Sequence, residues 1–346
     1  MSKVIIGIHG LGNKPSEKIL KEWWLKSILE GLENINKNNF KLNFEIIYWA
    51  NILHEKPLNE AITDKDDPCY VDERYITAPK NFIPTPHPVR QKVLRFIEKQ
   101  MDKIFLNEDL SINYSFISDM IIHRYFKELE MYYTEERSDK NDKKYFVRDA
   151  IRNRAAEVLK KHENDEIFLI AHSMGTIVIY DVLTFILPDL KIDTLVTMGS
   201  PLGLPIVMGK IAAEEKLKPC IKEKLKTPPG VKRYWYNFSD LEDKIAMNYN
   251  LGDDYDKNSS GVQAVDFVVN NNYEINGEKN PHKSYGYLRT PEFSKVLSEF
   301  LEREKPKPSM RFLKFVVKNF VKASKFAKRI MNSFNPFKSR DKDESR

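Results

Sequence analysis

The segment 166–187 constrains the fold more than any other part of the chain. An apolar run at 167–170 predicts a buried strand, and the apolar stretch 176–187 predicts a helix. Only the pentapeptide Ala-His-Ser-Met-Gly, residues 171–175, lies between them, so the connection must be a tight turn. Small residues at Ala171 and Gly175 allow the strand and the helix to pass closely. This strand-turn-helix predicts an α/β fold with Ser173 on the turn.

Ser173 is a candidate nucleophile. A serine on such a turn presents its Oγ to solvent, and the backbone N–H of the next residue, Met174, is free to stabilise an oxyanion. A serine also occurs by chance on this kind of turn in many α/β proteins. The pentapeptide alone therefore leaves a structural role for Ser173 equally open.

A second glycine-rich turn follows the first apolar strand at 4–8. His9, Gly10, Leu11 and Gly12 form this turn, which can place a backbone N–H beside the nucleophile. Two donors must converge on an oxyanion, and the N–H groups of Leu11 and Met174 are the expected pair. The spacing of the glycines fits neither GxGxxG nor GxxxxGK[ST], so it disfavours nucleotide binding.

An acid and a histidine follow the serine along the chain, in an order that is known for catalytic triads built on a strand-turn-helix serine. A strand is predicted at 231–238, and the acidic loop 239–245 after it contains Asp240, Glu242 and Asp243. His282 precedes a predicted terminal helix at 290–304. Taken singly, each acid is typical of a solvated loop and His282 of a surface histidine. Only their order and placement favour catalysis, in which His282 would take the proton of Ser173.

The remaining histidines and the cysteines give no metal or cofactor prediction. His172 is expected to pack under the turn of Ser173, and His9 to support the oxyanion turn. Four others lie in predicted loops or helices: His54, His87, His123 and His162. The sequence has no HExxH motif and no paired cysteine spacing. We therefore expect neither a cofactor nor a metal.

Taken together, these segments resemble the α/β-hydrolase superfamily, in particular its lipase-like and esterase-like members. The resemblance rests on residues 9–12, 171–175, 199–201, 243–245 and 282–285. It implies a mostly parallel central sheet flanked by helices, and a serine hydrolase in which Ser173, His282 and Asp243 form the triad. Trp235 and Asn237 precede Asp243 as in the family, which favours Asp243 and keeps Asp240 in reserve. Ala171 departs from the usual GxSxG pattern.

A long stretch before the nucleophile strand also departs from the family. A helix is predicted at 16–33 and a strand at 42–49, and about a hundred residues then precede the strand at 167–170. Helical periodicity occurs near 88–106, 114–133 and 145–162. The last helix is expected to pack on the sheet, and the first two to form a cap within an insertion at 52–140, after a proline-rich hinge at 83–88. A helical decoration without a substrate role stays equally open.

Composition fits one α/β domain over residues 1–304. The chain has 346 residues, of which 41% are hydrophobic, enough for a large core. The two cysteines, Cys69 and Cys220, define no disulfide framework and favour a reducing compartment. A core strand beginning at Val4 leaves no room for a signal peptide, and no apolar run approaches the length of about 18 residues that a spanning helix needs. We expect a cytoplasmic enzyme.

The C-terminal tail, residues 305–346, differs from the rest in charge. It holds eleven basic and no acidic residues between Lys305 and Arg340, whereas the whole chain has a net charge of +6. A helix predicted at 311–334 has lysines on one face and apolar residues on the other. This pattern favours a peripheral helix on an anionic membrane surface. Docking on the hydrolase domain is the next alternative, and nucleic acid is disfavoured because it leaves the apolar face unexplained.

The sequence therefore predicts a serine hydrolase of carboxylic esters, with a membrane lipid as a candidate substrate of a lipase or phospholipase. A soluble esterase or thioesterase is the alternative within the same class. A membrane-tethered binding module without catalysis is the alternative from another class, and the complete set of Ser173, Asp243 and His282 argues against it.

Overall fold

A computed structural model describes residues 2–79, 129–138, 142, 144–215, 224–246 and 248–304. The chain divides into two compact units, Met1–Leu301 and Glu302–Arg346. Several predictions lie outside the described residues: the hinge at 83–88, the helix at 88–106, most of the helix at 114–133, His87, His123, Cys220 and the tail helix at 311–334.

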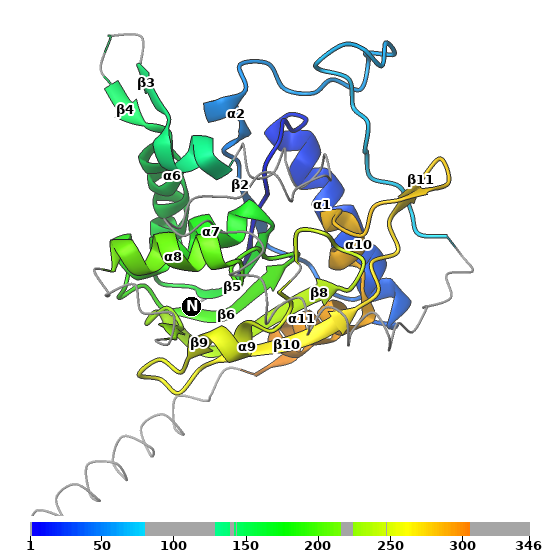
Figure 1. Ribbon diagram of the computed structural model, residues 1–346. Helices are drawn as coiled ribbons and strands as arrows, with labels where there is room; N and C mark the ends of the chain where they lie inside the picture. The colour runs from blue at the N-terminus through cyan, green and yellow to red at the C-terminus, as the bar shows by residue number, and fades with distance from the viewer. Residues whose placement is uncertain are drawn as a thin grey trace, which may run out of the picture. The chain divides into compact units, whose positions relative to one another are not determined.

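Six parallel strands form the central sheet of the first unit. Their order across the sheet is β10 (Ala264–Val269), β8 (Val231–Asp240), β6 (Ile192–Met198), β5 (Glu166–His172), β1 (Lys3–Ile8) and β2 (Phe44–Ile47). This sheet, with helices on both faces, confirms the predicted α/β fold (Figure 1). The chain starts at β1, moves outward to β2, and then crosses to β5 on the other side of β1. In open parallel sheets, ligands bind at the carboxyl ends of strands where the order reverses, here β1 and β5.

Two hydrophobic layers cover the sheet because successive side chains of each strand alternate between its faces. Ile6 and Leu169 belong to one layer, whereas Ile5 and Phe168 belong to the other. The first layer also contains α6 (Val147–Lys161), α7 (Met174–Asp181) and α8 (Pro205–Glu214). The second contains α1 (Glu17–Asn34), α10 (Ser284–Leu288) and α11 (Pro291–Glu302).

Several further elements of the described residues are short. They are α2 (Ala50–Leu53), the hairpin of β3 (Glu136–Ser138) and β4 (Lys144–Phe146), the pair β7 (Leu225–Lys226) and β9 (Tyr255–Asp256), α9 (Leu251–Asp254), and the hairpin of β11 (Glu274–Ile275) and β12 (Glu278–Lys279). No helix within the described ranges is both long and apolar enough to cross a membrane.

The predicted elements recur with shifted ends. α1, α6 and α11 match the helices predicted at 16–33, 145–162 and 290–304. The helix predicted at 176–187 begins two residues earlier, at Met174, and becomes a π-helix, η2, over Val182–Ile186. The strand predicted at 231–238 continues to Asp240, so the assignment of Asp240 to the acidic loop was wrong. Residues 129–134, the described end of the helix predicted at 114–133, are helical.

Candidate active site

Ser173 occupies a strained backbone position between β5 and α7. Its φ and ψ are +54° and −129°, a region that non-glycine residues rarely adopt and that costs about 1–3 kcal/mol. Glycines on two turns allow the backbone at Ser173 to lie against the turn that follows β1. A Cβ at Gly175 would lie 2.7 Å from the carbonyl oxygen of His9, and one at Gly10 would lie 2.6 Å from Cβ of Ser173. The turns after β5 and β1 are therefore in direct contact.

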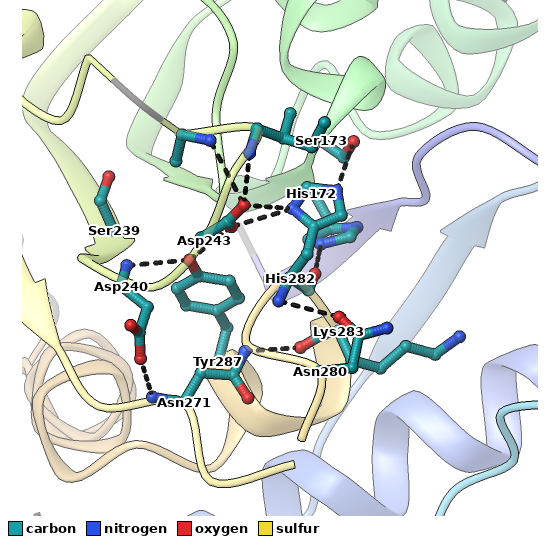
Figure 2. A network of polar contacts seen from close by, with 12 residues as sticks. His172, Ser173, Ser239, Asp240, Asp243, Asn271, Asn280, His282, Lys283 and Tyr287 are labelled. Atoms are coloured by element: carbon teal, nitrogen blue, oxygen red, sulfur yellow. Dashed lines mark hydrogen bonds and ion pairs between the residues drawn. The ribbon is translucent and has the colours of Figure 1, made fainter. Parts of the chain in front are cut away.

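A continuous line of hydrogen bonds joins Ser173, His282 and Asp243, which come from distant parts of the chain (Figure 2). His282 Nε2 lies 2.9 Å from Ser173 Oγ. His282 Nδ1 lies 2.9 Å and 2.8 Å from the two carboxylate oxygens of Asp243. The His282 side chain is 26% exposed, whereas that of Asp243 is fully buried. The histidine thus connects a buried carboxylate to the serine hydroxyl.

Both oxygens of the Asp243 carboxylate accept hydrogen bonds from groups other than His282. The backbone N–H groups of Ile245 and Ala246 donate to Oδ1 at 2.9 Å and 3.3 Å. The hydroxyl of Tyr287 donates to Oδ2 at 2.8 Å. Burial holds the pKa of Tyr287 well above its usual range, so this tyrosine stays a neutral donor. These bonds fix the carboxylate in the orientation that contacts His282.

Asp240, the reserve acid, has different partners. Its carboxylate accepts the backbone N–H groups of Glu242 at 2.7 Å and of Asn271 at 2.6 Å. Burial raises the pKa of Asp240 to about 6. The side-chain amide of Asn271 donates to the carbonyl oxygen of Lys283 at 2.8 Å. Asp240 is therefore linked to the loop that carries His282 through Asn271, and it is Asp243 that contacts the imidazole.

The side chains of His9 and Lys14 donate hydrogen bonds to backbone carbonyl oxygens of the turn after β1. His9 Nδ1 donates to the carbonyl oxygen of Gly10 at 2.8 Å, and this carbonyl shares a peptide group with the N–H of Leu11. His9 Nε2 accepts the backbone N–H of Trp49 at 3.1 Å, which fixes the tautomer. Lys14 Nζ donates to the carbonyl oxygens of Leu11 and Gly12. Burial lowers the pKa of His9 to about 3, so the ring stays neutral near pH 7.

His172 lies directly beside the catalytic candidate His282. Its Nε2 donates to the backbone carbonyl oxygen of His282 at 2.7 Å, and the ring centroids are 4.9 Å apart. Burial and then the proximity of His282 hold the pKa of His172 well below its usual range. His172 therefore supports the backbone at His282, a contact that the sequence pattern did not indicate.

Gly199 and Tyr287 are two residues at the site to which sequence reasoning assigned no individual role. Gly199 has φ +54°, and a Cβ there would lie 2.8 Å from Asp243 Oδ2 and 3.1 Å from His282 Nδ1. The glycine in the turn 199–201 was a usable signal, because a turn next to a triad leaves no room for a side chain. Tyr287 had no such signal, because it lies on the short helix α10 and its contact with Asp243 joins residues that are 44 positions apart.

The described residues contain no group of three or more histidine, cysteine or acidic side chains arranged to hold a metal ion. Comparison with known proteins gives no family assignment. No protein-family model matches the chain, and no curated protein matches it significantly.

Proposed function

We propose that the protein is a serine hydrolase of the α/β-hydrolase type that cleaves carboxylic esters. The observation that carries the proposal is the hydrogen-bonded series Ser173–His282–Asp243, with the serine on a strained strand-to-helix turn. The nucleophile follows β5, the acid follows β8, and the histidine follows β10, which is the chain order of triads on this fold. Because β5, β8 and β10 are parallel strands of one sheet, their carboxyl ends lie at the same edge, although β6 separates β5 from β8.

The first half of the reaction forms an acyl-enzyme. Ser173 Oγ attacks the ester carbonyl carbon while His282 Nε2 takes the hydroxyl proton, and Asp243 stabilises the resulting imidazolium. The carbonyl π-electrons move to oxygen, where the N–H groups of Leu11 and Met174 are the proposed donors. When the tetrahedral intermediate collapses, the C–O bond to the alcohol breaks and His282 returns the proton to that oxygen.

The second half regenerates the serine. Water attacks the acyl carbon as His282 takes one of its protons, and the bond to Ser173 Oγ then breaks as the proton returns to Oγ. The carboxylic acid leaves. A neutral His9 supports both halves, because its Nδ1–H holds the Gly10 carbonyl and thereby orients the Leu11 N–H.

Labelling with a fluorophosphonate tests the nucleophile without presuming a substrate. We expect one adduct, located by peptide mass spectrometry at Ser173 and lost in Ser173→Ala. His282→Ala is expected to abolish labelling as well, whereas His162→Ala, which alters a histidine paired with Glu45 and Asp165, keeps it. A folded wild-type protein that stays unlabelled, with and without liposomes, would favour the binding module without catalysis.

A membrane lipid is the proposed substrate class within this reaction, and the tail at 305–346 is its support. We expect deletion of 305–346 to abolish binding to anionic liposomes while leaving the fluorophosphonate rate on the soluble protein unchanged. The full chain should also cleave long-chain esters in anionic vesicles faster than short soluble esters. Equal rates on both substrates would instead support the soluble esterase or thioesterase.

A further inference from the structure

Glu73 contacts the first and the last residue of the turn 280–283, which contains His282. Its Oε1 accepts the side-chain amide of Asn280, and its Oε2 pairs with Lys283 Nζ at 2.5 Å. Asn280 Oδ1 in turn accepts the backbone N–H of His282 at 3.0 Å. Figure 2 shows the bond between Asn280 and His282 beside the triad. A single carboxylate from a remote segment thus meets the chain on each side of His282.

An ionised carboxylate can only accept hydrogen bonds, so the contact with Glu73 fixes which end of the Asn280 amide faces it. Glu73 accepts from the Asn280 NH₂ group, so the amide oxygen must face the His282 N–H. Although burial raises the pKa of Glu73, Lys283 and Asn280 outweigh this effect and lower it, which keeps the carboxylate ionised. An unpaired Asn280 would be free to rotate and release the His282 N–H.

Hydrogen bonds to buried residues hold the backbone on the C-terminal side of Glu73, which restricts where its carboxylate can lie. The buried Tyr273 donates its hydroxyl to the Arg74 carbonyl oxygen at 2.7 Å. Arg289, also buried, donates to the Ile76 carbonyl oxygen at 2.6 Å. Glu30 on α1 accepts the Tyr75 hydroxyl at 2.9 Å and the Ala78 N–H at 2.7 Å.

We propose that Glu73 is a positioning residue that aligns His282 with Ser173 by orienting Asn280. This inference rests on the proposed hydrolase function. The alternative is an ion pair that only adds stability. The Glu73 and Lys283 side chains are 32% and 22% exposed, and pairs this open to solvent contribute about 1 kcal/mol or less. A misplacement of about 1 Å at the histidine, in contrast, can lower the rate by about 100-fold.

The test compares Glu73→Ala, Asn280→Ala and the double variant by the saturating rate of fluorophosphonate labelling. We expect each single variant to lose about 10- to 100-fold in this rate with little change in probe affinity. The double variant should lose no more than Asn280→Ala alone, because both act on one bond to His282. Glu73→Gln, which keeps one acceptor oxygen for Asn280, should recover part of the rate. Glu22→Gln breaks an exposed ion pair with Lys26 and serves as the matched control.

A second readout keeps the two proposals separable. The downfield proton resonance of His282 Nδ1–H reports its bond to Asp243 whether or not Ser173 reacts, and we expect it to shift or broaden in Glu73→Ala. An unlabelled wild type would overturn the hydrolase proposal, and the resonance would still report the position of His282. Wild-type labelling rates and an unchanged resonance in Glu73→Ala would overturn the role of Glu73. Additive losses in the double variant would overturn the route through Asn280.

Discussion

Two buried aspartates in this molecule have similar surroundings and different partners. Asp243 accepts a hydroxyl from Tyr287 at 2.8 Å, and Asp181 accepts one from Tyr132 at 2.9 Å. Both carboxylates are nearly inaccessible. Asp243 binds His282, whose other ring nitrogen reaches Ser173. Asp181 instead binds Arg152 through Nε at 3.0 Å and Nη2 at 2.5 Å.

The partner decides what each aspartate can do. A guanidinium keeps its charge and its protons at every accessible pH, and Arg152 is itself buried and also held by Glu214. An imidazole can accept a proton at one ring nitrogen and donate one from the other, and the His282 side chain is partly exposed to solvent. Oδ1 of Asp181 has no partner among the described residues, whereas both oxygens of Asp243 are satisfied. The two carboxylates are thus alike in burial and in their tyrosine donors, and they differ in whether the partner is a buried guanidinium or a partly exposed imidazole.

Replacing the two acids near His282 should give the largest contrast. Asp243→Asn is expected to lower the fluorophosphonate rate by about 10⁴-fold, because the amide would stabilise the wrong imidazole tautomer and no longer the imidazolium. Asp240→Asn removes one acceptor from the Asn271 loop and should cost about 10-fold or less. Rates are measured on each variant after folding is checked by circular dichroism. Equal losses would show that Asp243 acts as a structural brace like Asp240.

Breaking the Arg152 cluster should affect stability and leave chemistry intact. Arg152→Met leaves the buried Asp181 carboxyl without its hydrogen-bonding cation, which is expected to lower the free energy of unfolding by about 3–5 kcal/mol. The loss is measured by urea denaturation, and the labelling rate per folded molecule should stay at the wild-type value. A comparable loss of rate would mean that the two buried clusters are coupled.

Sequence reasoning named Ser173, Asp243 and His282, which the structure brings into hydrogen-bonding contact. These residues could be named from the sequence because an apolar strand, a turn of small residues and the order serine, acid, histidine are all local or sequential features. The sequence already favoured Asp243 over Asp240. The structure adds that Asp243 contacts His282 Nδ1, whereas the Asp240 carboxylate accepts the N–H groups of Glu242 and Asn271.

Contacts between distant elements left no local signal. The partners Arg152 and Asp181 are separated by 29 residues and come from α6 and α7. Each looks like an ordinary polar residue of a helix. The edge strand β10 was not predicted either, because its side chains do not alternate cleanly between buried and exposed.

Two histidines at opposite ends of the sheet should respond oppositely to acid. The folded-state pKa of His9 is lowered to about 3, mainly by burial, so below about pH 6.5 the unfolded chain binds a proton that the folded chain does not. Stability is then lost as pH falls, by up to about 1.4 kcal/mol per pH unit. Although burial lowers the pKa of His162, its hydrogen bonds to Glu45 and Asp165 outweigh this and raise it, so protonation of His162 favours the folded state.

The measurement is the slope of unfolding free energy against pH, between about pH 7 and pH 5. His9→Gln should reduce the loss of stability in acid, and His162→Gln should increase it. Contributions of Asp181 and Asp240, whose pKa values burial raises to about 6, are shared by all variants and cancel in the comparison. Identical slopes in His9→Gln and the wild type would contradict a buried neutral His9.

The smallest expected effect comes from the two tyrosines that bind the two aspartates. Tyr287→Phe removes the donor to Asp243 Oδ2 and the acceptor of the Asp240 N–H, and Tyr132→Phe removes the donor to Asp181. Each should cost about 1–3 kcal/mol of stability, because a buried polar group loses its partner. Only Tyr287→Phe should also slow labelling, by about 10-fold, since the Asp243 carboxylate can then turn away from His282. If both substitutions slow labelling equally, the tyrosine contact reports general rigidity, and the orientation of Asp243 rests on its backbone donors at Ile245 and Ala246.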